Sequence, residues 1–158
     1  MKNVVIKGLR KLDACSNAVK WAGQFDSDQE AWDKCERADW MLWIVGKLCG
    51  ERGSKEHRRV VLAACACAKT ALKFIPRKEN RPLNAILLAE RYGRGKNISI
   101  DDLRAAAAAY AANAAAYAAA YAANAATAAT AAADARIAAL KEMAALIRKI
   151  IPKMPRLK

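Results

Sequence analysis

Apolar residues recur every three or four positions along most of this chain, which is the spacing of one face of an α-helix. From Val4 to Gly23 the pattern is continuous and predicts one helix, with an apolar face made of Leu9, Leu12, Cys15, Val19 and Ala22. The same periodicity predicts a short helix after Ser27 and further helices over 40–48, 55–75 and 82–92. A last helical stretch is expected from 101 to 151.

Residues that cap helices mark the ends of these segments. A capping box pairs a Ser or Thr with an acidic residue three positions later, and each side chain accepts a hydrogen bond from the other residue's backbone. The pairs with this spacing are Ser27 with Glu30 and Ser99 with Asp102. Asp39 and Ser54 are expected to be the N-caps of the helices that follow them. Helix ends are expected near Gly23, Gly50, Gly53, Pro76, Gly93 and Gly95, and Pro82 suits a first helical turn.

The fold class follows from this pattern and from the small number of turn residues. With seven Gly and four Pro in 158 residues, the chain lacks the many turns of a sandwich or barrel. We expect an all-α fold, a compact multi-helix bundle with a long alanine-rich C-terminal helix or helix pair. The length suits one domain. Within 1–158, residues 1–100 should form mixed short helices, 101–151 the alanine-rich segment and 152–158 a basic tail. The end of the chain, from Ile151 to Lys158, is expected to fray.

Alanine makes up about a quarter of the chain, far more than in an ordinary globular domain. In the alanine tract the tyrosines and asparagines follow spacings that place them on one helical stripe. The stripe consists of Tyr110, Asn113, Tyr117, Tyr121 and Asn124. It fits a tightly packed bundle helix, a self-association seam, or a stripe that faces a ligand. The uncharged run 105–133 contains no Leu, Ile, Val or Phe, so we expect no membrane span.

The charge of the chain is strongly positive and unevenly distributed. The formal net charge is +13. Residues 1–50 contribute +1, residues 51–104 contribute +7 and residues 105–158 contribute +5. A surface of this sign attracts anions and speeds their encounter with the protein. The charge therefore favours an anionic partner, although a basic surface that only keeps the protein soluble would look the same.

One short basic segment has residues suited to binding a phosphate or a nucleotide. It follows the predicted helix 82–92 and consists of Arg91, Tyr92, Arg94 and Lys96, with glycines at 93 and 95. Arginine and lysine would hold the phosphates, and Tyr92 would stack on a base. An exposed loop between helices would have the same composition. A second basic set, Arg58 and Arg59 with Arg77, Lys78 and Arg81, is not expected to form one site, because a helix of about 30 Å separates its two parts.

Two tryptophans form the most distinctive short motif of the sequence. Trp40 and Trp43 lie three positions apart, on one face of the predicted helix. They are either two core indoles or the wall of an aromatic pocket that binds a ligand.

The remaining candidate residues exclude several kinds of chemistry. The single histidine, His57, and five cysteines without a C-x-x-C pair do not fit a two-Cys, two-His zinc site. Cys65 and Cys67 should point to different helix faces, and an odd number of thiols suits buried, reduced cysteines in the cytoplasm. We find no pair of carboxylates placed for acid–base catalysis and no catalytic residues. We therefore expect no enzyme activity, no metal and no cofactor.

Several runs of residues resemble a known family. They are Lys11–Cys15, Ala18–Ala22, Glu30–Trp32, Asp39–Trp43 and the alanine/tyrosine tract followed by a basic helix that ends in Ile150-Ile151-Pro152. Together they resemble the immunity protein family, small helical proteins of bacteria and bacteriophages, over nearly the whole chain. The resemblance implies a cytoplasmic, non-enzymatic protein that neutralises another molecule by binding it. It assigns no catalytic or binding residues.

These observations lead to three functional hypotheses. The first is an immunity or phage counter-defence protein that sequesters an anionic partner, either a signalling nucleotide or an acidic effector protein. The second is an accessory protein that binds nucleic acid. The third is a structural module that self-assembles through the alanine-rich helix, and a homo-oligomer is expected in any case.

Overall fold

The computed structural model describes residues 2–74, 79–99, 101, 102, 104 and 129–156. This part of the chain is all-α, as the sequence predicts, and contains no strand. The helices are α1 (Lys2–Lys11), α2 (Ser16–Ala22), α3 (Asp28–Lys34), α4 (Ala38–Leu48), α5 (Lys55–Lys69), α6 (Arg81–Gly93) and α8 (Ala129–Ile150), with a short 3-10 turn η1 (Leu72–Phe74) after α5.

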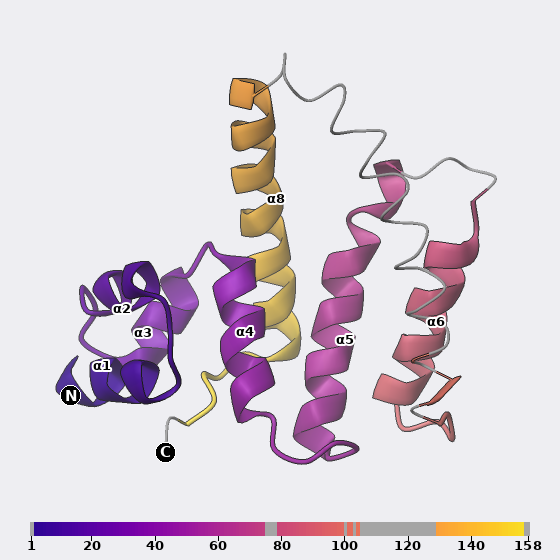
Figure 1. The fold of residues 1–158 in the computed structure, drawn as a ribbon, viewed down its shortest axis with the longest axis horizontal. Helices are drawn as coiled ribbons and strands as arrows, with labels where there is room; N and C mark the ends of the chain where they lie inside the picture. The colour runs from indigo at the N-terminus through magenta and orange to yellow at the C-terminus, as the bar shows by residue number, and fades with distance from the viewer. Residues whose placement is uncertain (1, 75–78, 100, 103, 105–128, 157–158) are drawn as a thin grey trace.

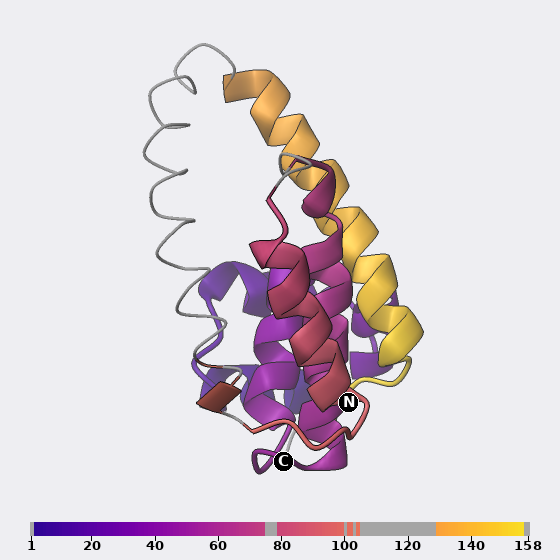
Figure 2. The same cartoon turned by 90° about the vertical axis from the view of Figure 1, so that its right-hand side faces the viewer.

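The helices pack around α5, which lies between α6 on one side and α4 and α8 on the other (Figure 1). The short helices α1, α2 and α3 form a cluster on the side of α4 that faces away from α5. In the view turned by 90°, α6 (red) lies in front of α5, and α8 (orange to yellow) runs along the right-hand edge (Figure 2). The buried side chains of the N-terminal helices and of α4, α5 and α8 form one continuous core.

Small and branched apolar side chains fill the centre. Ala63 of α5 and Ala144 and Ile147 of α8 have no exposed surface. Met41 and Val45 of α4 are each 1% exposed. Alanine at two of these positions lets the helix backbones lie close together, and the larger side chains of α4 and α8 fill the space between them. Burial of this apolar surface holds α4, α5 and α8 together.

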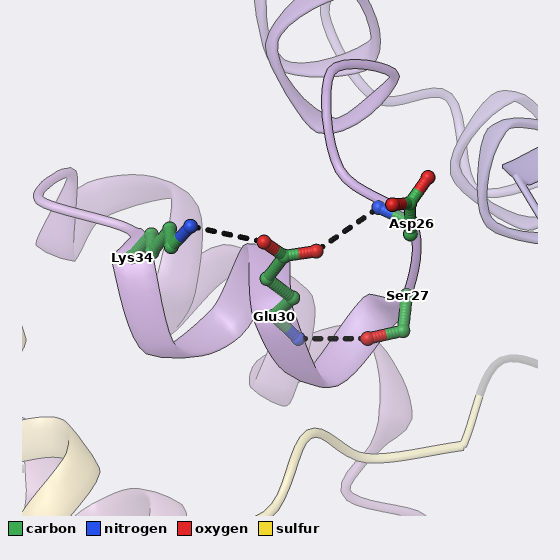
Figure 3. A network of polar contacts seen from close by, with 4 residues as sticks. All are labelled: Asp26, Ser27, Glu30 and Lys34. Atoms are coloured by element: carbon green, nitrogen blue, oxygen red, sulfur yellow. Dashed lines mark hydrogen bonds and ion pairs between the residues drawn. The ribbon is translucent and has the colours of Figure 1, made fainter.

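The predicted caps at Ser27, Ser54 and Ser99 are confirmed. Figure 3 shows the N-terminus of α3, where Ser27 Oγ accepts a hydrogen bond from the Glu30 backbone N–H at 3.1 Å. The Glu30 carboxylate accepts from the Asp26 backbone N–H rather than from that of Ser27, and it also pairs with Lys34 at 2.9 Å. The other two sites have the expected bonds, from His57 N–H to Ser54 Oγ and reciprocally between Ser99 and Asp102.

The single helix predicted from Val4 to Gly23 is wrong, because the chain turns at Asp13 between α1 and α2. Asp13 has a φ of +61°. The backbone N–H of Ala14 donates to the Leu9 carbonyl, and that of Asp13 donates to the Arg10 carbonyl. These two bonds form a Schellman motif, which ends a helix at a residue with left-handed backbone angles. Aspartate tolerates this conformation better than most residues, so it can take the place of glycine.

Two helix ends also differ from the prediction. The N-cap of α4 is Arg37, and Asp39 lies in the first turn of the helix, where it pairs with Arg37 instead of capping. An acidic residue there still complements the positive end of the helix. The helix expected over 55–75 ends at Lys69, and Thr70 Oγ1 donates to the Cys67 carbonyl at 2.7 Å.

The prediction that the chain frays from Ile151 onwards is wrong for the residues up to Met154. Ile151 is buried, and its carbonyl accepts a hydrogen bond from the indole N–H of Trp32 at 3.0 Å. The Gln29 side chain bonds to the backbone of both Pro152 and Met154. The segment is therefore anchored to α3 as far as Met154. The other question about the C-terminal half, whether 101–151 forms one helix or two, concerns residues 105–128, outside the described ranges.

Candidate functional site

All four tryptophans of the chain line one pocket. The pocket has a volume of about 340 Å³ and lies among α1, α2, α3 and α4. Trp32 is 3% exposed and belongs to the buried wall, whereas Trp21, Trp40 and Trp43 are half-buried. The rings of Trp21 and Trp40 meet edge to face, with centroids 5.9 Å apart. This volume and apolar lining are typical of a site for a small molecule.

The charged residues that line the pocket are all aspartates. They are Asp13, Asp28 and Asp39. Asp39 is paired with Arg37, whose Nε donates to the carboxylate at 2.9 Å. This hydrogen bond is the main cause of the lowered pKa of Asp39. The Arg37 guanidinium also lies over the Trp40 ring, with its central carbon 4.4 Å from the ring centroid.

Sequence reasoning found half of this aromatic lining. Trp40 and Trp43, which the motif singled out, do line the pocket, together with Trp21 of α2 and Trp32 of α3. Trp21 and Trp32 carry no local signal, because they lie on separate short helices whose packing brings them to α4. Trp32 is fixed by its bond to the Ile151 carbonyl, from a segment more than a hundred residues away.

The basic segment at 91–96 forms a tight turn at the end of α6. The Lys96 N–H donates to the Arg91 carbonyl and the Gly95 N–H to that of Tyr92, which is again a Schellman motif. Gly95 provides the left-handed conformation, with a φ of +79°. Arg91, Arg94 and Lys96 are exposed on this turn. Arg94 lies 3.8 Å from Glu90, whose carboxylate is held more closely by Lys69 at 2.7 Å.

Tyr92 does not lie where a base could stack on it. Its side chain is only 5% exposed, and its hydroxyl is 3.2 Å from His57 Nδ1. The backbone N–H of Gly53 donates to the same nitrogen at 3.4 Å, so this ring nitrogen is an acceptor. The prediction that Tyr92 stacks on a ligand is therefore wrong for this conformation. The residue instead packs the end of α6 against the start of α5.

The structure places Arg58 of α5 beside the turn at the end of α6. Its guanidinium carbon lies 5.9 Å from the centroid of the Tyr92 ring, and its Nη1 is 3.1 Å from the position that a Cβ would occupy at Gly95. Its Nε is buried without a hydrogen-bond partner. Gly93 lets α6 lie close against α5, since a Cβ there would lie 2.7 Å from the Leu62 side chain. No local sequence pattern predicts that these residues meet.

The predicted ligand-binding residues therefore do not form one site. Trp40 and Trp43 line the pocket on α4, whereas none of Arg91, Tyr92, Arg94 and Lys96 lines it. The turn that carries these four lies at the end of α6, on the opposite side of α5 from α4 (Figure 1). The stripe from Tyr110 to Asn124 lies outside the described residues.

The prediction of buried thiols is confirmed for Cys35, Cys65 and Cys67 and is wrong for Cys15 and Cys49. Cys65 Sγ lies 3.8 Å from the Ile86 carbonyl of α6, and Cys67 Sγ lies 3.8 Å from the Met143 carbonyl of α8, so they point to different faces of α5. Burial raises the pKa of each to about 11. Burial also raises the pKa of Cys35. Cys15 is exposed and Cys49 is half-buried.

We expect a disulfide-exchange reagent such as DTNB to modify Cys15 and Cys49 quickly and the other three cysteines only as the protein opens. The reactive form is the thiolate, and both burial and a high pKa suppress it. The measurement is the number of thiols released in the fast phase at pH 8, compared with the number in denaturant. Five thiols in the fast phase would contradict the described packing of α5.

These thiols also give stability a pH dependence. An unfolded cysteine has a pKa of about 8.5, so above this pH the unfolded chain has released protons that folded Cys65 and Cys67 still bind. The free energy of unfolding should therefore fall as the pH rises from about 8.5 towards 11.

The described residues also bear on metal binding and on membrane insertion. No group of three or more His, Cys, Asp or Glu side chains in these ranges is placed to hold a metal ion. None of the helices in the described part is long and apolar enough to cross a bilayer. Comparison of the chain with protein-family models, with curated proteins and with solved structures finds no match.

Proposed function

We propose that this protein is a non-enzymatic binding protein that sequesters an anionic partner, a signalling nucleotide or an acidic effector protein. The proposed binding surface is the turn 93–96 together with Arg58 and Arg91, here called the basic turn. The resemblance to immunity proteins supports the same kind of action, neutralisation by binding.

The observation that carries this proposal is the position of Arg58. Basic residues at the C-terminal end of a helix stabilise that helix by themselves, so Arg91, Arg94 and Lys96 alone would not indicate a ligand. Arg58 comes from another helix, and its guanidinium makes no ion pair within the described ranges. Arg58 lies against Gly95, in the turn that carries Arg94 and Lys96. Holding a half-buried cation there costs free energy, and an anion bound at the turn would offset that cost.

The arrangement suits phosphate or carboxylate groups. A guanidinium offers several N–H donors in a plane and binds an oxyanion through two of them. Arg94 and Lys96 project from a turn whose backbone is fixed by Gly95, so their main chain needs no reordering when a ligand binds. A nucleotide would contact the turn through its phosphates, and its base would pack on a residue other than Tyr92.

The test is binding of anions to the protein and to a matched pair of double variants. Native mass spectrometry of the purified protein, alone and with mononucleotides, cyclic dinucleotides and short oligonucleotides, identifies the ligand class. For the ligand found, Arg94→Ala/Lys96→Ala should lower the affinity by about 100-fold, because two charge-assisted contacts are lost. Arg136→Ala/Lys149→Ala removes the same charge from exposed sites on α8 and should change it by less than about threefold.

Three outcomes separate the hypotheses. Equal weakening by the two double variants would assign the effect to net charge and overturn the basic turn as the site. Binding only to oligonucleotides, with a steep dependence on salt, would favour the nucleic-acid accessory protein, because counterion release grows with the number of phosphates neutralised. Loss of helical circular dichroism in Arg94→Ala/Lys96→Ala would disqualify that variant, and Arg58→Met, which keeps the apolar stem, would replace it.

A further inference from the structure

The pocket of the four tryptophans is an open recess at the surface, because its half-buried rings are partly exposed to solvent. At about 340 Å³ this pocket has room for a small organic molecule. Its floor is buried, with Trp32, Cys35 and Met41 at 5% exposure or less, and its half-buried rings and exposed Cys15 reach the surface. A ligand could therefore enter without unfolding the cluster α1–α3.

The charge of the lining is opposite to that of the protein. The chain carries 28 Lys and Arg residues, yet no basic residue lines the pocket, and three aspartates do. Arg37 neutralises Asp39. Asp13 and Asp28 form no ion pair in the part of the chain that the structure describes, so two negative charges face the pocket without a counterion. This balance disfavours anions and favours a cation.

The indole rings themselves attract positive charge. The ring face of tryptophan is the best aromatic surface for a cation, and cages of such rings recognise ammonium groups. Two of these rings already hold cations of the same chain, Arg37 over Trp40 at 4.4 Å and the Lys47 ammonium 5.7 Å from the Trp43 centroid. Neither Arg37 nor Lys47 lines the pocket, so the pocket itself stays open to a ligand.

From these observations we infer that the pocket binds a small organic cation with an apolar body, such as a substituted ammonium. The apolar body lies among Trp21, Trp40 and Trp43, and the charged group lies towards Asp13 and Asp28. This site is separate from the basic turn and takes a ligand of opposite charge. A test of it therefore does not depend on the proposed function.

Intrinsic fluorescence tests this inference directly, because every tryptophan of the chain lines the pocket. We would titrate the full chain with benzyltrimethylammonium and, in parallel, with uncharged 2-phenylethanol and anionic phenylacetate. The cation should change the emission in a saturable way, and it should bind at least about tenfold more tightly than either of the others. No saturable change with any of the three, or a preference for phenylacetate, would overturn the proposal.

Two double variants with the same net charge test whether the bound cation lies near Asp13 and Asp28. Asp13→Asn/Asp28→Asn should weaken binding of benzyltrimethylammonium by about fivefold and leave the weak binding of 2-phenylethanol unchanged. Asparagine also tolerates the positive φ of residue 13, so the fold should be kept. Asp101→Asn/Asp134→Asn makes the same charge change at exposed positions outside the pocket lining and should have little effect. Equal weakening by both variants would show that the pocket carboxylates do not bind the cation.

Trp43→Phe tests the same site independently, in case Asp13→Asn/Asp28→Asn does not fold. Phenylalanine keeps an aromatic ring in the wall but is a weaker partner for a cation. Isothermal calorimetry should show a several-fold loss of affinity for benzyltrimethylammonium with unchanged thermal stability. Unchanged affinity would contradict a role for the Trp43 ring.

Discussion

Replacing Ile147 by alanine should lower the free energy of unfolding by about 2–5 kcal/mol. Ile147 lies on α8 in the centre of the molecule and has no exposed surface. Truncation removes buried methyl groups and leaves a cavity between α8 and the neighbouring helices α4 and α5, which hold each other in place and cannot close fully around it. For a chain of this size the melting temperature should fall by several degrees, and urea or thermal unfolding followed by circular dichroism measures the loss.

Ile137→Ala is the matched control. Ile137 lies on the same helix and loses the same atoms, but its side chain is 52% exposed. The change to alanine also raises helix propensity slightly. We expect a change within about 0.5 kcal/mol. Similar losses for the two variants would show that α8 does not pack on the core as described.

Ending the chain after Ile150 should be about as destabilising, with a loss of roughly 3–5 kcal/mol. The truncation exposes the surface that Ile151 covers and removes the acceptor of the Trp32 indole N–H. A buried donor without a partner costs about 1–3 kcal/mol, and the buried isoleucine contributes a similar amount. The bonds of Gln29 to the backbone of Pro152 and Met154 are lost as well.

A shorter truncation separates this anchoring from a loss of charge. Removing 156–158 takes away two basic residues but leaves every contact from Ile151 to Met154 in place, so the free energy of unfolding should change by less than about 0.5 kcal/mol. Tryptophan emission adds a second readout, because only the longer truncation should expose Trp32 to water. Equal stability of the two truncated chains would mean that the segment after α8 is not anchored to α3.

Most of the local structure could be read from the sequence. Ser27 and Ser54 cap helices where the spacing placed them, because a cap depends on residues only three positions apart. Pro82 lies in the first turn of α6 as expected. The break at Asp13 was missed because an aspartate with a positive φ is uncommon and the apolar periodicity continues through it.

The candidate site was predicted less well, for a physical reason. The motif at Trp40 and Trp43 is local and could be found, whereas Trp21 and Trp32 reach the same pocket only because α2 and α3 fold against α4. The basic turn was also recognised, but its partner Arg58 was assigned to a different basic set. Tyr92 was expected at the surface, and the packing of α6 on α5 buries it.

The sequence by itself determined the all-α class, most helix ends and the strongly positive charge. These depend on composition and on bonds between residues a few positions apart. Only the tertiary structure decided which side chains meet. Two examples are the Trp32–Ile151 bond and the contact of Arg58 with Gly95, which join distant segments. A third is the tryptophan pocket, whose lining comes from four helices and contains no basic residue. Such contacts depend on how the helices pack against one another. Many arrangements of the same amphipathic helices would bury their apolar faces, and the close packing of particular side chains selects one of them.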